Sequence, residues 1–299
     1  MAITATDILK QILIDQMRRT IDGQEAVRQI LTELRSQVVL EIATAPAGTF
    51  TGYHYQQMLQ ELNRQLATAE TKIRVETSAG ISDSWEAGRD MLPQMAQTGS
   101  SITLSSYGIS SHLVDQIRDF TWGKVSGITN DLQGKIRAEL SLGVLGGKTP
   151  QEIAASIAGS LGDRPGVFGT VSYRAEVIVK TELGRTFSMA SQASMENAAA
   201  TLPELQKMWL HAGHPKSPRI YHLNLNGAIK PVEQPFLVGS ISMMYPRDPK
   251  APIGEIINCG CMHVPYMKAW GTQKQFEKSW SDAQKAANKP KGPFKPKGA

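Results

Sequence analysis

The spacing of helix-breaking residues constrains the fold of this chain more than any other feature. Up to about residue 200, apolar side chains recur every three or four positions, as in the run Val27, Leu31, Leu34 and Val38. This period places them on one face of a helix. After Pro203, prolines and glycines come too often for long helices. The pattern predicts an α+β protein, with a mostly α-helical N-terminal two-thirds, a small irregular β-rich C-terminal unit and a flexible basic tail.

Helix breakers also divide the helical part of the chain. The first helical stretch carries Gly23, which we interpret as a break or a weak point. The second covers about residues 55–95, and it is expected to break within 78–83 (SAGISD) and to end near Pro93. Residues 97–111 are small and polar, so an exposed connector is expected there.

A third helix is expected over residues 112–145, and the next begins with a well-formed start signal. Thr149 is its N-cap, Pro150 takes the first helical position, and Glu152 completes a capping box. A long helix follows over residues 170–199. We expect four parts: a helical N-terminal region, a second helical part, a small β-rich unit, and a helix with a tail, at residues 1–110, 111–202, 203–266 and 267–299.

The net charge of +5 is concentrated at the C-terminal end. Residues 267–299 carry eight lysines and two acids, so the rest of the chain is close to neutral. A helix is expected over 270–287, and a Lys/Pro/Gly-rich end follows that cannot bury enough apolar surface to order itself. Such an end contacts DNA through phosphates, without sequence preference, or else only solubilises the chain. The candidate DNA contacts are Lys285, Lys289, Lys291, Lys295 and Lys297.

Hydropathy and cysteine content limit the setting of the protein. No stretch approaches the roughly eighteen apolar residues of a membrane span. The N-terminus lacks the features of a signal peptide. Two cysteines without a secretory signal argue against a disulfide framework and for an intracellular setting.

Residues able to carry chemistry concentrate between positions 203 and 266. Four of the six histidines and both cysteines lie there. Zinc prefers such ligands, and a small unit with little core would gain from a structural metal. In a strand, residues two apart share a face, so the cysteines could converge. The single residue between the cysteines argues against zinc, since zinc knuckles usually have two, so packing of two buried thiols is the favoured interpretation; a metal site and a redox pair are the alternatives. The candidate ligands are His214, His222, Cys259 and Cys261.

Catalytic alternatives have less support in the sequence. His222 and Asn224 occur together as in His-Asn-His nucleases, but the downstream helix lacks the histidine that such a site needs. A cysteine nucleophile paired with histidine is a further alternative, although nothing marks an oxyanion hole. On the helix before Pro203, Glu182 and Arg185 are expected on a solvated or partner-facing surface, with Glu182 as an alternative polar anchor onto the β-rich unit.

The order of residues from Lys207 to Tyr266 carries more information than any single motif. A tryptophan-bearing strand precedes an arginine, a histidine and a glycine; a phenylalanine, a Tyr-Pro-x-Asp-Pro turn and Asn-Cys-x-Cys then follow. These residues are Trp209, Arg219, His222, Gly227, Phe236, Tyr245, Pro246, Asp248, Pro249, Asn258, Cys259 and Cys261. This series resembles the phage Mu F-like minor head protein family, also called phage head morphogenesis proteins.

The resemblance extends over about residues 140–266. The stretch 173–191 is similar to the family's Arg-Ala-Glu…Arg-Thr-Glu…Arg helix, with Lys180 where arginine is usual, and 146–157 resembles its glycine-rich turn into a short helix. Two positions depart from the pattern. His214 stands where the family has an acid, and Gly260 stands where it has arginine between the cysteines, so any role of those side chains is in doubt here.

The resemblance implies a minor structural protein of a tailed-phage or prophage head, not an enzyme. Its partners would be the portal protein and other head proteins, with DNA through the tail. It would act in head morphogenesis, DNA packaging or DNA delivery, in the virion near the portal vertex and in the host cytoplasm during assembly. The Cys-x-Cys strand would close the β-rich unit, pair with the His222 region and bring both cysteines to His222. A metal-dependent nucleic-acid-processing enzyme and a DNA-binding accessory protein remain the alternatives.

Overall fold

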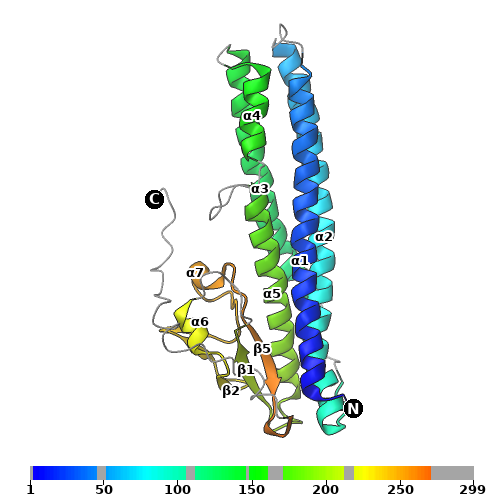
Figure 1. Ribbon diagram of the computed structural model, residues 1–299, viewed down its shortest axis with the longest axis vertical. Coiled ribbons are helices and arrows are strands. Elements are labelled where there is room, and N and C mark those ends of the chain that lie inside the picture. The colour runs from blue at the N-terminus through cyan, green and yellow to red at the C-terminus, as the bar shows by residue number, and fades with distance from the viewer. Residues whose placement is uncertain are drawn as a thin grey trace. The chain divides into compact units, whose positions relative to one another are not determined.

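The computed structural model (Figure 1) describes residues 3–45, 52–105, 112–145, 148–160, 171–211 and 219–270. The helical part contains five helices: α1 (Ala5–Ala43), α2 (Gly52–Ser100), α3 (His112–Val144), α4 (Pro150–Ser160) and α5 (Val171–Ala198). The part that follows contains β1 (Gln206–Leu210), α6 (Ile220–Asn224), β2 (Ile229–Pro231), β3 (Phe236–Val238), β4 (Ile241–Met243), α7 (Ile253–Ile256), β5 (Met262–Tyr266) and the 3-10 turn η1 (Lys268–Trp270). The expected α+β architecture, helical first and β-rich afterwards, is confirmed.

Two expected interruptions of helices are wrong. α1 runs without a break past Gly23, and α2 runs through 78–83 and past Pro93 to Ser100. Burial explains the continuity of α2, because Ile81, within the expected break, and Trp85, just after it, lie in the interior. A glycine within a helix costs about 1 kcal/mol, which is less than the burial of one such side chain contributes.

The start of α4 is confirmed atom by atom. The Thr149 hydroxyl accepts the backbone N–H of Glu152 at 3.2 Å, and the Glu152 carboxylate accepts the backbone N–H of Thr149 at 2.7 Å. These reciprocal bonds satisfy two donors that a helix end otherwise leaves unpaired.

The chain forms two compact units, each assembled from separate segments. The helical unit comprises Ile21–Gly80 and Gln116–Lys180, and the mixed unit comprises Met1–Thr20, Ile81–Asp115 and the chain from Thr181 onward. The boundaries fall within long helices and not between them. The expected division at residues 110, 202 and 266 follows sequence order and stays a prediction.

The helical unit has an apolar core with a polar network beside it. Apolar side chains from its helices are buried, among them Leu31, Leu66 and Leu132. The Glu70 carboxylate accepts the hydroxyls of Ser126 at 2.7 Å and Thr129 at 2.6 Å. These bonds join α2 to α3 within this unit.

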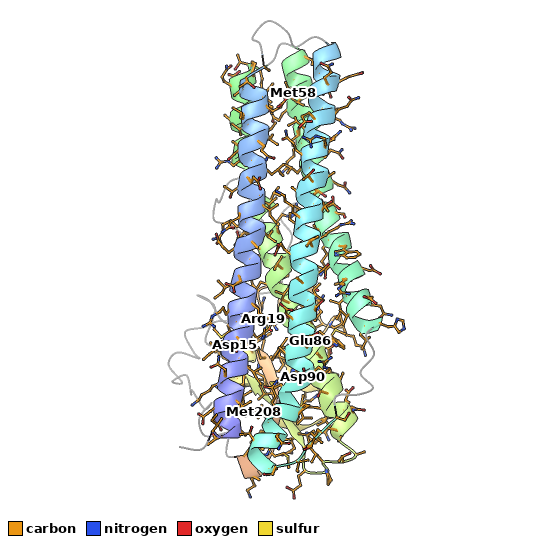
Figure 2. All side chains as sticks on the ribbon, turned by 90° about the vertical axis from the view of Figure 1, so that its right-hand side faces the viewer. Asp15, Arg19, Met58, Glu86, Asp90 and Met208 are labelled. Atoms are coloured by element: carbon orange, nitrogen blue, oxygen red, sulfur yellow. The ribbon has the colours of Figure 1, made fainter. Side chains whose placement is uncertain are left out.

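The mixed unit is built on a three-stranded antiparallel sheet in the order β2-β1-β5, beside a β3-β4 hairpin. Successive residues of β1 face opposite sides. Met208 joins a large core with Leu9 of α1, Met91 of α2 and Phe187 of α5; its position is marked in Figure 2. Trp209 joins a second, smaller core. One face of the sheet therefore packs against the helices, and the cysteines pack against the other face.

Several expectations fall outside the described residues. They include residues 106–111 of the connector, the helix 270–287 beyond Trp270 and the whole lysine-rich end. Among the helices that the structure describes, none is both long and apolar enough to cross a membrane.

Candidate functional site

The second face of the sheet brings together residues that are far apart in sequence. His222 lies on the short helix α6, while Cys259 and Cys261 lie in the connector between α7 and β5. The expectation that the cysteines sit on a strand paired with the His222 region is wrong. β5 begins at Met262 and pairs with β1, because its apolar residues cover the large core. The expected meeting of both cysteines with His222 is nevertheless found.

His222, Cys259 and Cys261, which we call the Cys–His cluster, share one buried point. Cys259 Sγ lies 3.4 Å and Cys261 Sγ 3.6 Å from His222 Nδ1. The three donor atoms lie within 4.8 Å of one another, and each residue is 2% exposed. Both cysteines are free thiols. The three side chains thus present two sulfurs and one nitrogen to the same small volume.

A carboxylate holds the other side of the imidazole. Glu255 of α7 lies 2.8 Å from His222 Nε2. Arg219, just before α6, approaches Glu255 at 3.7 Å and donates to the carbonyl of Ile257 at 2.8 Å. These contacts fix the ring so that Nδ1 faces the sulfurs.

Aromatic rings enclose the cluster. Trp209 of β1 packs edge-to-face on His222, with ring centroids 5.7 Å apart, and on Phe236, with centroids 5.2 Å apart. The Trp209 Nε1–H is buried and makes no regular hydrogen bond to a described residue, but it lies near Cys261, whose thiolate form it favours.

Arg247 connects the cysteine connector to α5. Its side chain is buried, and it donates to the carbonyl of Cys259 at 2.8 Å and to the carbonyl of Gly184 at 2.9 Å. A Cβ at Gly184 would lie 2.4 Å from the guanidinium carbon of Arg247, so only glycine fits there without rearrangement. Arg247 itself has φ 67°, a left-handed conformation that costs free energy for a residue other than glycine. The surrounding contacts must hold it there.

The charges in this interior perturb the ionisation of the cluster. A hydrogen bond from the Cys261 thiol, followed in importance by His222 and Arg247, holds the pKa of Cys259 well below its usual range against the effect of burial. Burial and the neighbouring Cys259 sulfur raise the pKa of Cys261. Burial alone would lower the pKa of His222, but Cys259 and Glu255 outweigh it and raise that pKa to about 9. Without a metal, the site therefore favours a Cys259 thiolate beside a protonated His222 imidazolium at neutral pH.

Several residues of the ordered series hold the backbone around the cluster. The Asp248 carboxylate accepts the backbone N–H of Met244 at 2.8 Å and of Lys250 at 2.9 Å, and so closes the turn that contains Arg247. Gly227 and Asn258 have φ 80° and φ 55°, a region that glycine and asparagine enter most easily. Tyr245 stacks on His263 with centroids 6.0 Å apart. These residues have structural roles.

The two α5 residues expected on a solvated or partner-facing surface, Glu182 and Arg185, are buried, so the expected solvated surface is wrong at these positions. Glu182 is 0% and Arg185 is 3% exposed, and the two form an ion pair. Arg185 also donates to the carbonyl of Arg247 at 3.1 Å. The anchor from α5 onto the β-rich unit is therefore mainly Arg185, where the sequence suggested Glu182.

The structure assigns the remaining candidates as follows. His214 and the five tail lysines lie outside the described residues. His263 is buried on β5, away from the cluster's three donor atoms, and neither of its ring nitrogens has a hydrogen-bond partner among the described residues. Glu255 and Arg247 were missed as site residues. Glu255 begins the same short stretch that contains both cysteines, and this proximity in sequence is a signal that could have identified it.

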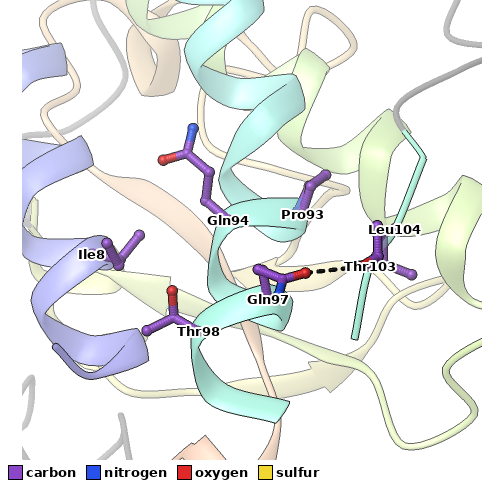
Figure 3. Close-up of a pocket in the computed structure, with 7 residues that line it drawn as sticks. All are labelled: Ile8, Pro93, Gln94, Gln97, Thr98, Thr103 and Leu104. Carbon is purple, nitrogen blue, oxygen red and sulfur yellow. Dashed lines mark hydrogen bonds between the residues drawn. The ribbon is translucent and has the colours of Figure 1, made fainter. Parts of the chain in front are cut away.

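The hollow in Figure 3 lies elsewhere in the mixed unit, between α1 and α2. It is open, with a volume of about 380 Å³, and the Thr103 hydroxyl donates to Gln97 Oε1 across it at 2.9 Å. None of the described residues that line it is an acid, a histidine or a cysteine. They are Ile8, Pro93, Gln94, Gln97, Thr98, Thr103 and Leu104.

Comparison with known proteins gives one partial similarity. No model of a protein family matches the chain, and no solved structure matches it. The chain is 33% identical over 88 residues to the "Uncharacterized protein YqbB" of Bacillus subtilis (strain 168). The match covers 28% of this chain and 29% of that relative. Its name states no activity, so the similarity assigns no function.

Proposed function

We propose that this chain is a minor structural protein of a tailed-phage or prophage head, associated with the portal and acting in head morphogenesis, DNA packaging or DNA delivery. One observation carries the proposal. The residues of the ordered series, which lie between Trp209 and Cys261, all belong to the mixed unit, and the central members of the series are buried there. These buried members are Trp209, His222, Phe236, Asp248, Cys259 and Cys261.

This clustering supports the family resemblance because chance matches to single motif positions have no reason to converge. The residues also have complementary tasks. Asp248 and Asn258 shape turns, Trp209 and Phe236 fill the core, and His222 meets both cysteines. If a family shares a fold, the residues that its members have in common are expected to build one domain together, and this series does so.

Burial favours a structural over a catalytic role for the same residues. His222 is 2% exposed, so a nucleic-acid substrate cannot reach its ring without opening the unit. The Asp248 carboxylate is occupied by two backbone N–H groups. A nuclease assay on His222→Ala and the parent chain is expected to show no turnover for either. Metal-dependent turnover by the parent that His222→Ala abolishes, with the fold intact, would favour the enzyme alternative.

Particle composition tests the head-protein role directly. Quantitative mass spectrometry should be applied to particles from the strain that carries this sequence, with the portal and major capsid proteins as references. We expect a few copies per particle, retained with the portal after DNA removal. A strain lacking the chain should produce fewer infectious particles and recover when the chain is supplied in trans. If the chain is missing from particles and assembly intermediates alike, and its loss leaves the yield unchanged, the proposal is wrong.

A further inference from the structure

We propose that His222 Nδ1, Cys259 Sγ and Cys261 Sγ bind one Zn²⁺ ion as structural ligands. The ion would tie α6 to the connector between α7 and β5. The same region is held by a hydrogen bond from Arg219 to the carbonyl of Ile257 and by the contact of His222 with Glu255 of α7. The inference concerns the isolated protein and stands independently of the head-protein role.

The spacing of the donor atoms matches zinc. Zinc lies about 2.3 Å from thiolate sulfur and about 2.0–2.1 Å from imidazole nitrogen, so a tetrahedral site separates sulfur from nitrogen by roughly 3.5 Å. The observed separations from His222 Nδ1 are 3.4 Å to Cys259 and 3.6 Å to Cys261. An ion can therefore be bound by all three atoms with little movement of their side chains.

The ligand chemistry and its support also match. Soft thiolates with imidazole select zinc over magnesium or calcium. A histidine that binds a metal usually gives its other ring nitrogen to a carboxylate, which fixes the tautomer and aims the ligand nitrogen. Glu255 is placed for this role, 2.8 Å from His222 Nε2. Simple packing of the ring would not need a carboxylate there.

The surroundings favour negatively charged sulfurs. Arg247 is a buried cation that donates hydrogen bonds to two backbone carbonyls, one of them that of Cys259. The buried Trp209 Nε1–H lies near Cys261 and makes no regular hydrogen bond to a described residue. Cationic and N–H groups buried in an apolar interior need negatively charged or accepting partners. Two thiolates bound to a divalent ion would make these groups favourable.

Metal content and ligand identity of the full chain test the proposal. The protein is saturated with Zn²⁺, dialysed and analysed for metal, and a second sample is loaded with Co²⁺. We expect about one zinc per chain, thiolate-to-cobalt charge-transfer absorption, and two sulfur neighbours at about 2.3 Å by X-ray absorption. The Cys259→Ser/Cys261→Ser variant should lose all three signals. His112→Gln, which changes an exposed histidine on α3, is the matched control and should keep them.

Glu255→Gln provides a graded test, because Glu255 is a positioning residue that acts through His222. It should weaken zinc binding about 10- to 100-fold while the two-sulfur coordination persists. If the double serine variant fails to fold, the parent chain and Glu255→Gln still decide the question. The proposal is overturned if the parent retains no zinc or if its bound metal has no sulfur neighbour. It is also overturned if the purified parent contains a Cys259–Cys261 disulfide and binds no zinc.

Discussion

Lys207 is the most unusual single residue of the mixed unit, because a lysine with 0% exposure lies on the central strand β1. Its ammonium donates to the carbonyl of Met244 at 2.8 Å and to Gln192 Oε1 at 3.2 Å, and it lies 5.3 Å from the ring centroid of Phe236. Burial lowers its pKa to about 8, against the opposing effect of nearby carboxylates. The folded protein therefore bears a charge below this pH that it accommodates poorly.

This burial predicts a pH dependence of stability. In the unfolded chain a lysine keeps its proton up to about pH 10.4. Between about pH 8 and pH 10 the unfolded state binds the extra proton, so the Lys207 contribution to the free energy of unfolding increases with pH. Over that window the free energy of unfolding of the parent should increase by about 2–3 kcal/mol relative to that of Lys207→Met. Denaturant unfolding of both proteins across the window measures the difference.

The comparison with Lys207→Met isolates this residue, because other titrating groups, such as His222, are present in both proteins. Lys72→Met is the control, since Lys72 is 48% exposed in its side chain and should give no comparable pH dependence. Parallel stability curves for the parent and Lys207→Met would contradict the shifted pKa.

At the scale of elements, the packing of α2 on α5 depends on one glycine. A Cβ at Gly88 would lie 2.3 Å from the backbone carbonyl oxygen of Phe187 and 3.0 Å from the Ala190 Cβ. Backbone cannot move aside as a flexible side chain can. The two helices therefore approach closely only because position 88 has no side chain.

Gly88→Ala should destabilise the mixed unit by about 1–3 kcal/mol, the usual cost of overpacking. Amide hydrogen exchange in α5 near Phe187 should become faster, which measures the local loss. Gly127→Ala in α3 is the matched control, because nothing lies within 4 Å of a Cβ built there. It should stabilise its helix by about 0.5–1 kcal/mol. Equal effects of the two substitutions would contradict the close approach.

Sequence patterns predicted the elements that local rules determine. The capping box at Thr149 and the long helix α5 follow from spacing and composition, and the structure confirms both. Continuity of α2 through Gly80 could not be predicted, because it depends on the burial of Ile81 and Trp85 against other segments. Local propensity is a weak guide where tertiary packing decides.

The candidate site shows the same limit. The meeting of His222 with both cysteines was predicted, but as strand pairing, whereas a short helix and a connector provide it. Glu255 and Arg247 were missed because their contacts join distant positions. Arg247 reaches Gly184 across 63 residues of sequence, and His222 reaches Glu255 across 33. No local period marks such pairs, since only the folded arrangement of α5, α6 and α7 creates them.

At the scale of the whole molecule, charge is distributed unevenly along the chain. The last segment, residues 267–299, holds eight of the lysines and two acids, whereas the remainder is close to neutral. Attraction to DNA phosphates should therefore depend on this segment and not on the rest of the chain. Each phosphate that a lysine neutralises releases condensed counterions, so binding must weaken as salt rises.

This partition predicts how DNA binding responds to salt. A variant with glutamine at the five lysines Lys285, Lys289, Lys291, Lys295 and Lys297 keeps the chain length but removes five charges. If all five contact duplex phosphates, the slope of log affinity against log salt should fall by about 4 to 5. Fluorescence titration of labelled duplex DNA at several salt concentrations measures the slope. Deletion of residues 285–299 should reproduce the change.

A second variant separates contact by the tail from contact by the folded part. Replacing three exposed basic residues of the helices α1 and α2, Arg18, Arg64 and Lys72, removes charge from the surface of the helices. Since these side chains pair with neighbouring acids, their loss should leave the salt slope nearly unchanged. A slope that falls with the helix variant and persists without the tail lysines would place DNA on the folded units. The tail would then serve solubility alone, and DNA contact in a head protein would require a surface on the helices.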